Sequence, residues 1–99
     1  MSRDVDATLN ERGQKYGPFR DHALVTQEVK KILRDTVECN EQYMHNLSAY
    51  DKAVVDEALD MIAHKLGRIV NGDVSYDDSW RDIAGYAELV VRHFKEAPF

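Results

Sequence analysis

The sequence predicts an all-α fold, a small bundle of three to four helices in a single domain that spans residues 1–99. Two observations predict this class. Apolar residues recur every three or four positions over long stretches, and no stretch shows the strict alternation of a half-buried strand. Residues that start and stop helices lie at the ends of these stretches, such as the capping-box pair Ser48 and Asp51 and the dipeptide Gly17-Pro18.

Four helices are expected in chain order, with a connection of no clear period at residues 41–47. The third helix is expected to end at Asn71-Gly72 with a left-handed glycine, and Ser79 with Asp82 makes a second capping box at the start of the last helix. The expected ranges are Asp4–Tyr16, Pro18 or Asp21 to about Asn40, about Ala49 to Asn71, and Asp78 or Ser79 to about Phe94.

Each of the three longer helices carries one apolar stripe when its residues are placed at about 100° intervals. We expect these stripes to face a shared core. On the last helix Gly85 and Leu89 lie opposite the stripe, and we expect that side to meet a second subunit. The three stripes comprise Leu24, Val25, Val29, Ile32, Leu33 and Val37; Val55, Ala58, Leu59, Ile62, Leu66, Ile69 and Val70; and Trp80, Ile83, Ala84, Ala87, Val90, Val91 and Phe94.

Composition narrows the classes of function. The chain has 99 residues, 43% of them hydrophobic and 31% charged, which is ordinary for a globular domain. A formal net charge of −5 argues against general binding to nucleic acid or to an anionic membrane. A domain this short buries a limited share of its surface, so we expect a homo-oligomer to complete the bundle.

No address other than the cytoplasm is readable in the sequence. The N-terminal residues lack the apolar run of a signal peptide, and no stretch approaches the length of a transmembrane span. Cys39 is the only cysteine, so an intramolecular disulfide and a cysteine-based zinc site are excluded. We expect a cytoplasmic protein with a buried, reduced thiol at Cys39.

Carboxylates on the third and fourth helices are candidate ligands for Mg²⁺. Glu57 and Asp60 lie one turn apart, and Asp78 and Asp82 are separated by four positions and project away from the Trp80 stripe. Carboxylate oxygens suit a hard divalent cation. The same spacings also fit a solvated helix face and the capping of a helix start, so both interpretations stay open.

Cations and aromatic rings could complete a site for a phosphorylated ligand. His64, Lys65 and Arg68 continue the polar side of the third helix after Asp60, and a lysine and an arginine together suit a polyphosphate. The segment E-R-G-Q-K-Y-G near the N-terminus either holds a phosphate or a base, or anchors the first helix onto the body. The remaining candidate ligand-binding residues are Arg12, Lys15, Tyr16, Trp80 and Tyr86.

Three segments carry a resemblance to a known family. They are E-R-G-x-x-Y-G at Glu11–Gly17, M-I-A-H-K-L-G-R-I-V-N-G-D at Met61–Asp73, and D-S-W-R-D-I-A-G-Y-A at Asp78–Ala87. Together they resemble a family of short proteins encoded by bacteriophages and prophages. That resemblance implies a location in the cytoplasm of the host cell.

More remotely, the chain is similar to the all-α nucleoside triphosphate pyrophosphohydrolases of the MazG and dimeric dUTPase type. Those proteins are small helical oligomers that present E-x-x-D and E-E-x-x-E carboxylates to Mg²⁺. Glu57-x-x-Asp60 matches the first pattern, whereas the second is missing, so that Asp78 and Asp82 would have to replace it. The resemblance implies Mg²⁺ as the cofactor and Glu57, Asp60 and Asp82 as catalytic residues.

Three functions fit these residues. The first is Mg²⁺-dependent hydrolysis of a nucleoside triphosphate, which needs at least three carboxylates that converge within reach of a metal. The second is a non-catalytic helical oligomer that binds or sequesters a nucleotide or signalling nucleotide, for which cations and stacking groups suffice. The third is a phage inhibitor of a host protein, which needs an exposed patch and no pocket.

Overall fold

The structure is a computed structural model that describes residues 3–95, and its elements are all helical. The all-α class is confirmed. Residues 41–47, expected to be a connection, contain a single π-helical turn. The elements in order are α1 (Arg3–Tyr16), α2 (Phe19–Val37), η1 (Gln42–Asn46), α3 (Ala49–Asn71) and α4 (Asp77–Lys95).

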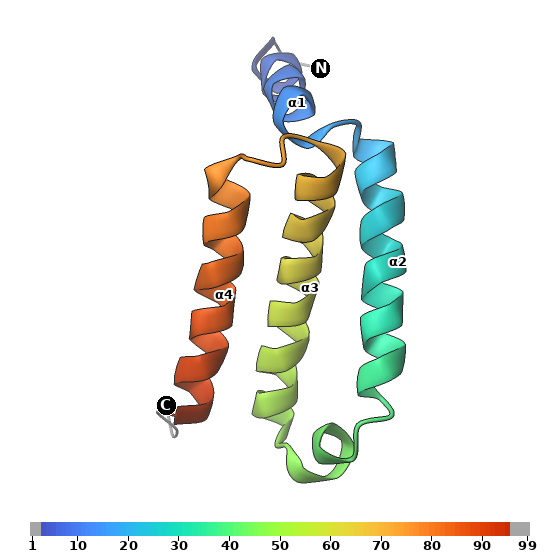
Figure 1. Cartoon of the computed structure of the whole chain (residues 1–99), viewed down its shortest axis with the longest axis vertical. Helices are drawn as coiled ribbons and strands as arrows, with labels where there is room; N and C mark the ends of the chain where they lie inside the picture. The colour runs from blue at the N-terminus through green and yellow to red at the C-terminus, as the bar shows by residue number, and fades with distance from the viewer. Residues whose placement is uncertain (1–2, 96–99) are drawn as a thin grey trace.

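The three long helices lie side by side in one layer, with α3 between α2 and α4 (Figure 1). Both neighbours run antiparallel to α3. Helix α1 projects beyond the layer at the end where α3 finishes and α2 and α4 begin, and η1 closes the opposite end (Figure 1). Helix α3 therefore has a neighbour on two sides and two open faces between them. Within residues 3–95, none of the helices combines the length and apolarity that crossing a membrane requires.

Two of the expected helix ends are present. The Asp51 amide donates to Ser48 Oγ at 3.0 Å, and the Ser48 amide donates to Asp51 Oδ2 at 3.2 Å, which completes the capping box that starts α3. Gly17 follows α1 with φ of +78°, a left-handed conformation that glycine adopts without steric cost. These local signals were correctly interpreted from the sequence.

The predictions for two other helix ends are wrong. Gly72 is not left-handed, since its φ is −133°. Its lack of a side chain matters because a Cβ there would overlap the Lys15 carbonyl oxygen, where α1 crosses the end of α3. Ser79 does not cap α4, because the helix already begins at Asp77 and Ser79 is buried inside it. Asp82 forms an ion pair with Lys65 instead.

The core within one chain is thin, which corrects the expected stripes. Among the described residues the buried apolar side chains are Ala58, Ala63 and Ile69, and no large side chain is fully buried. A single layer of helices covers only the sides on which the helices touch, so stripe residues that point out of the layer stay exposed. Cys39 is exposed too, contrary to expectation. The exposed stripe residues are Leu24, Ile32, Leu66, Val70, Trp80, Ala84, Ala87, Val91 and Phe94.

Candidate functional site

The segment Glu11–Gly17 packs the N-terminal helix against the end of α3. The Asp73 amide donates to the Lys15 carbonyl oxygen at 2.6 Å. The guanidinium carbon of Arg68 lies 4.2 Å from the centre of the Tyr16 ring, which is the geometry of a cation–π contact. The segment thus anchors α1, which is one of the two roles that the sequence predicted for it. The same contact holds the Arg68 side chain over Tyr16 at the surface of α3.

Lys15 is engaged by neighbours of its own. Its ammonium donates to Glu11 Oε1 at 3.0 Å and to the Tyr76 hydroxyl at 3.3 Å, and it lies 4.9 Å from the centre of the Tyr76 ring. The hydrogen bond to Glu11, and then the one to Tyr76, raise the pKa of Lys15. Arg12 lies nearby on the exposed surface of α1. Lys15 therefore supports the anchor of α1 more directly than it offers a free charge to a ligand.

Two histidines meet where α2 crosses α3. His22 Nε2 and His64 Nδ1 are 3.3 Å apart, and the two rings are nearly perpendicular. His22 and Thr26 are almost completely buried, with 5% and 3% of their surfaces exposed. The helices approach this closely because residue 67 is glycine: a Cβ there would overlap Thr26 Oγ1 and lie 2.9 Å from His22 Nδ1.

The electrostatic surroundings of this histidine pair are cationic. Burial, followed by the positive charge of Arg68, the neighbouring imidazole of His22 and the charges of Lys30 and Lys65, lowers the pKa of His64 to about 4. Burial is also the main cause of the lowered pKa of His22. Both imidazoles are therefore neutral at pH 7. We call Lys30, His64, Lys65 and Arg68 the basic cluster.

Carboxylates form ion pairs with only part of the basic cluster, although Glu38, Asp56 and Asp60 line a small cavity together with Lys30. The Lys65 ammonium, with only 12% of its side chain exposed, pairs with Asp82 Oδ2 at 2.8 Å and joins α3 to α4. No carboxylate of residues 3–95 lies within ion-pair distance of Lys30 or Arg68. The cluster thus combines the paired ammonium of Lys65, the unpaired ammonium of Lys30, a guanidinium packed on a tyrosine ring and a neutral imidazole. Such a set of donors suits an anion.

Acidic solution should destabilise the protein through His64. Its folded-state pKa of about 4 lies below the usual 6.5, so the unfolded chain takes up protons first as the pH falls. We expect the free energy of unfolding to decrease by roughly 1–3 kcal/mol between pH 6.5 and 4 from this group. Urea unfolding across that range should show a smaller loss in His64→Gln. His45→Gln, which removes an exposed histidine of η1, is the control and should behave as the wild type.

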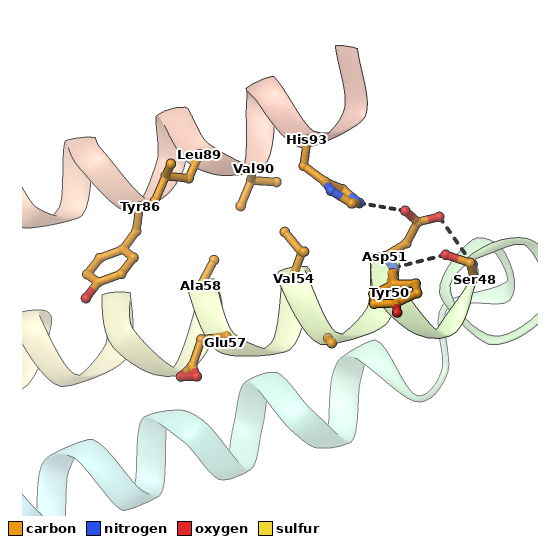
Figure 2. A pocket seen from close by; sticks show the side chains of 11 residues that line it. Ser48, Tyr50, Asp51, Val54, Glu57, Ala58, Tyr86, Leu89, Val90 and His93 are labelled. Atoms are coloured by element: carbon orange, nitrogen blue, oxygen red, sulfur yellow. Dashed lines mark hydrogen bonds and ion pairs between the residues drawn. The ribbon is translucent and has the colours of Figure 1, made fainter. Parts of the chain in front are cut away.

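A second feature is an apolar groove between α3 and α4 (Figure 2). Its volume is about 1010 Å³, and Tyr50, Val54, Ala58, Tyr86 and Leu89 contribute to its walls. At one end His93 Nε2 contacts Asp51 Oδ1 at 2.6 Å, and this contact is the main cause of the lowered pKa of Asp51. The charged groups that line the groove include the carboxylates of Asp51 and Glu57. The groove therefore disfavours phosphate, although it contains two of the predicted site residues, Glu57 and Tyr86.

The four predicted metal ligands have separate surroundings. Glu57 lines the groove, and Asp60 borders a small cavity of about 230 Å³ together with Lys30 and Arg34 from α2. Within the described part of the chain, no group of three or more His, Cys, Asp or Glu side chains is close enough to hold a metal ion. Asp78 accepts a hydrogen bond from the Tyr76 hydroxyl at 3.0 Å, and Asp82 pairs with Lys65.

Among the predicted ligand-binding residues, the structure brings together Tyr16, His64, Lys65 and Arg68. Trp80 lies apart from them, half-exposed near the start of α4, where its indole N–H donates to the Val74 carbonyl oxygen at 2.8 Å. The sequence analysis did not identify several residues around the basic cluster, the α1 anchor and the groove. They are His22, Thr26, Lys30, Gly67, Tyr76 and His93.

One of the missed residues had a signal in the sequence. At about 100° per residue, His22 falls within the apolar stripe of α2, between Val29 and Leu33 in angle. A histidine in that position needs a buried polar partner. The partner, His64, is 42 positions away, and no local spacing identifies it.

Comparisons of this chain with protein-family models, with curated proteins and with solved structures found no match.

Proposed function

We propose that this protein binds a nucleotide, or another phosphorylated small molecule, through the basic cluster. The observation that carries the proposal is the concentration of positive charge around His64, where Lys30 and Arg68 lack a carboxylate partner within residues 3–95. Like charges held close together repel each other, and a bound polyanion relieves that repulsion. Binding of a phosphate group would therefore lower the free energy of the clustered cations.

Three members of the cluster have distinct roles in this proposal. Arg68 offers a planar fork that can donate two parallel hydrogen bonds to one phosphate, and the Tyr16 ring beneath it limits its rotation. Lys65 supplies a point charge whose position is fixed by Asp82. The neutral imidazole of His64 can donate a hydrogen bond without adding a repulsive charge, because its pKa is lowered to about 4.

The positions of the four candidate carboxylates favour binding of the ligand without its hydrolysis. Hydrolysis with Mg²⁺ needs converging carboxylates, and the candidates Glu57, Asp60, Asp78 and Asp82 lie in different surroundings. Mg²⁺-dependent pyrophosphohydrolysis therefore stays a prediction. The phage origin, the location in the host cytoplasm and the inhibition of a host protein are predictions of the same standing.

A nucleotide titration tests the proposal. Calorimetry with a panel of ribo- and deoxyribonucleoside triphosphates, with and without Mg²⁺, should show saturable binding that weakens as salt is added. A parallel assay should detect no release of pyrophosphate. Mg²⁺-dependent release would instead establish the hydrolase, and a panel without any binding would overturn the proposed function.

A further inference from the structure

One face of the helical layer is apolar and uncovered. It contains Ile32 of α2, Leu66 and Val70 of α3, and Trp80, Val91 and Phe94 of α4, which are between 37% and 65% exposed. When the helices are placed side by side and antiparallel, as in Figure 1, helical spacing at about 100° per residue puts these six side chains on the same side. We call this side the apolar face.

The apolar face lacks charged residues from Val55 to Val70 of α3 and from Trp80 to Phe94 of α4. Lys52, at the start of α3, falls at the same helical angle as Val70, and its ammonium donates to the Met44 carbonyl oxygen beside it at 3.3 Å. The row of the apolar face on α3 comprises Val55, Leu59, Ile62, Leu66 and Val70. Its row on α4 comprises Trp80, Ile83, Ala87, Val91 and Phe94. Steps of three or four residues between apolar positions are those with which helices pack against other helices. The opposite face contains the basic cluster and the groove, so the two faces have different chemistry.

The chain is also too open for a self-sufficient monomer. Its accessible surface is 7333 Å², whereas a compact monomer of 11.4 kDa exposes about 5,800 Å². Its radius of gyration is 16.1 Å, against about 13 Å for a compact domain of this length. Part of the difference comes from α1, which projects from the layer (Figure 1). The remainder, at most about 1,500 Å², is of the order of the area that each partner loses in an obligate dimer.

We propose that a second copy of this chain covers the apolar face, so that two three-helix layers form a six-helix sandwich. A partner that supplies the missing half of the core must be present whenever the chain folds. A second copy of the same chain meets this condition, because it is made wherever the first copy is made. Because the rows Val55–Val70 and Trp80–Phe94 of this face are uncharged, two identical copies can meet there without opposing like charges. The basic cluster and the groove stay open on the outside. This contact differs from the expected one through Gly85 and Leu89, and it does not depend on the proposed function.

The single tryptophan gives a direct test. We expect light scattering to give twice the chain mass of 11.4 kDa at micromolar concentration. Trp80 should be shielded from iodide quenching in that dimer, although half of its surface is exposed in one chain. The melting temperature should rise with protein concentration, as it does for a dimer that dissociates when it unfolds. These three measurements need no variant.

Two matched substitutions locate the contact. Leu66→Glu places a charge on the apolar face and should convert the dimer to monomer or prevent folding. Leu89→Glu places the same charge at a leucine on the opposite side of the layer, where 59% of the residue's surface is exposed, and should leave the dimer intact. A monomeric wild type with a concentration-independent melting temperature would overturn the proposal and assign the face to a different protein. A dimer that Leu89→Glu dissociates, with Trp80 fully quenchable, would overturn it in favour of the other side.

Discussion

Replacing Gly67 by valine should destabilise the protein by at least about 3 kcal/mol, because buried polar side chains of α2 occupy the space that a side chain would need. A Cβ at this position overlaps Thr26 Oγ1 and lies 2.9 Å from His22 Nδ1. Both residues are buried, so neither can move aside without separating α2 from α3. Urea unfolding followed by circular dichroism measures the effect.

Gly85→Val is the matched control for that substitution. Gly85 lies inside α4, and a Cβ there would meet no atom of residues 3–95 within 4 Å. Because glycine is the poorer helix former, valine should change stability by no more than about 0.5 kcal/mol, in the favourable direction. Equal effects at the two positions would show that α2 does not approach α3 as closely as described. A large loss only at Gly85 would indicate that a partner meets that side.

Arg68→Ala should weaken nucleotide binding by roughly 10- to 100-fold, since charge-assisted hydrogen bonds contribute about 1.5–3 kcal/mol each. The guanidinium already lies at the surface over the Tyr16 ring, so little freedom would be lost when it meets a phosphate. Calorimetric titration of the variant measures the change.

Arg92→Ala controls for the loss of one positive charge. Arg92 pairs with Glu88 on α4, at the end of the layer away from α1. Its removal should change the affinity less than twofold. Tyr16→Phe tests whether the Tyr16 hydroxyl binds the ligand or the ring only supports Arg68. Because phenylalanine keeps the ring beneath Arg68, this variant should retain most of the affinity for nucleotide. Unchanged affinity in Arg68→Ala would remove this helix from the ligand site.

The sequence predicts most of the fold, because helices depend on local signals. Apolar periodicity, the Ser48–Asp51 capping box and the glycine at position 17 each act within a few residues, and each gave the correct element or end. The errors concern what lies across space. Gly72 was expected to be left-handed, but its position is determined by the crossing of α1, which local sequence does not specify.

The candidate site was only partly predictable for the same reason. Lys65 and Arg68 were found because they share a helix face with His64. The pairing of His64 with His22, and of Lys65 with Asp82, depends on how α2 and α4 pack against α3. The apolar stripe of α4 was correctly placed on one side of the helix. It was wrongly assigned to the interior of one chain, because periodicity identifies an apolar face without showing what covers it.

An anion that binds beside His64 should be reported most directly by the pKa of that imidazole. Burial and the surrounding cations lower this pKa to about 4 in the free protein. A bound phosphate would cancel part of the cationic charge, so NMR titration of the histidine rings in saturating nucleoside triphosphate should show the His64 pKa raised toward its usual 6.5. The ring signals of His45, in η1 at the other end of the layer, should not respond to the nucleotide. A nucleotide that binds and leaves the His64 pKa unchanged would contradict the account.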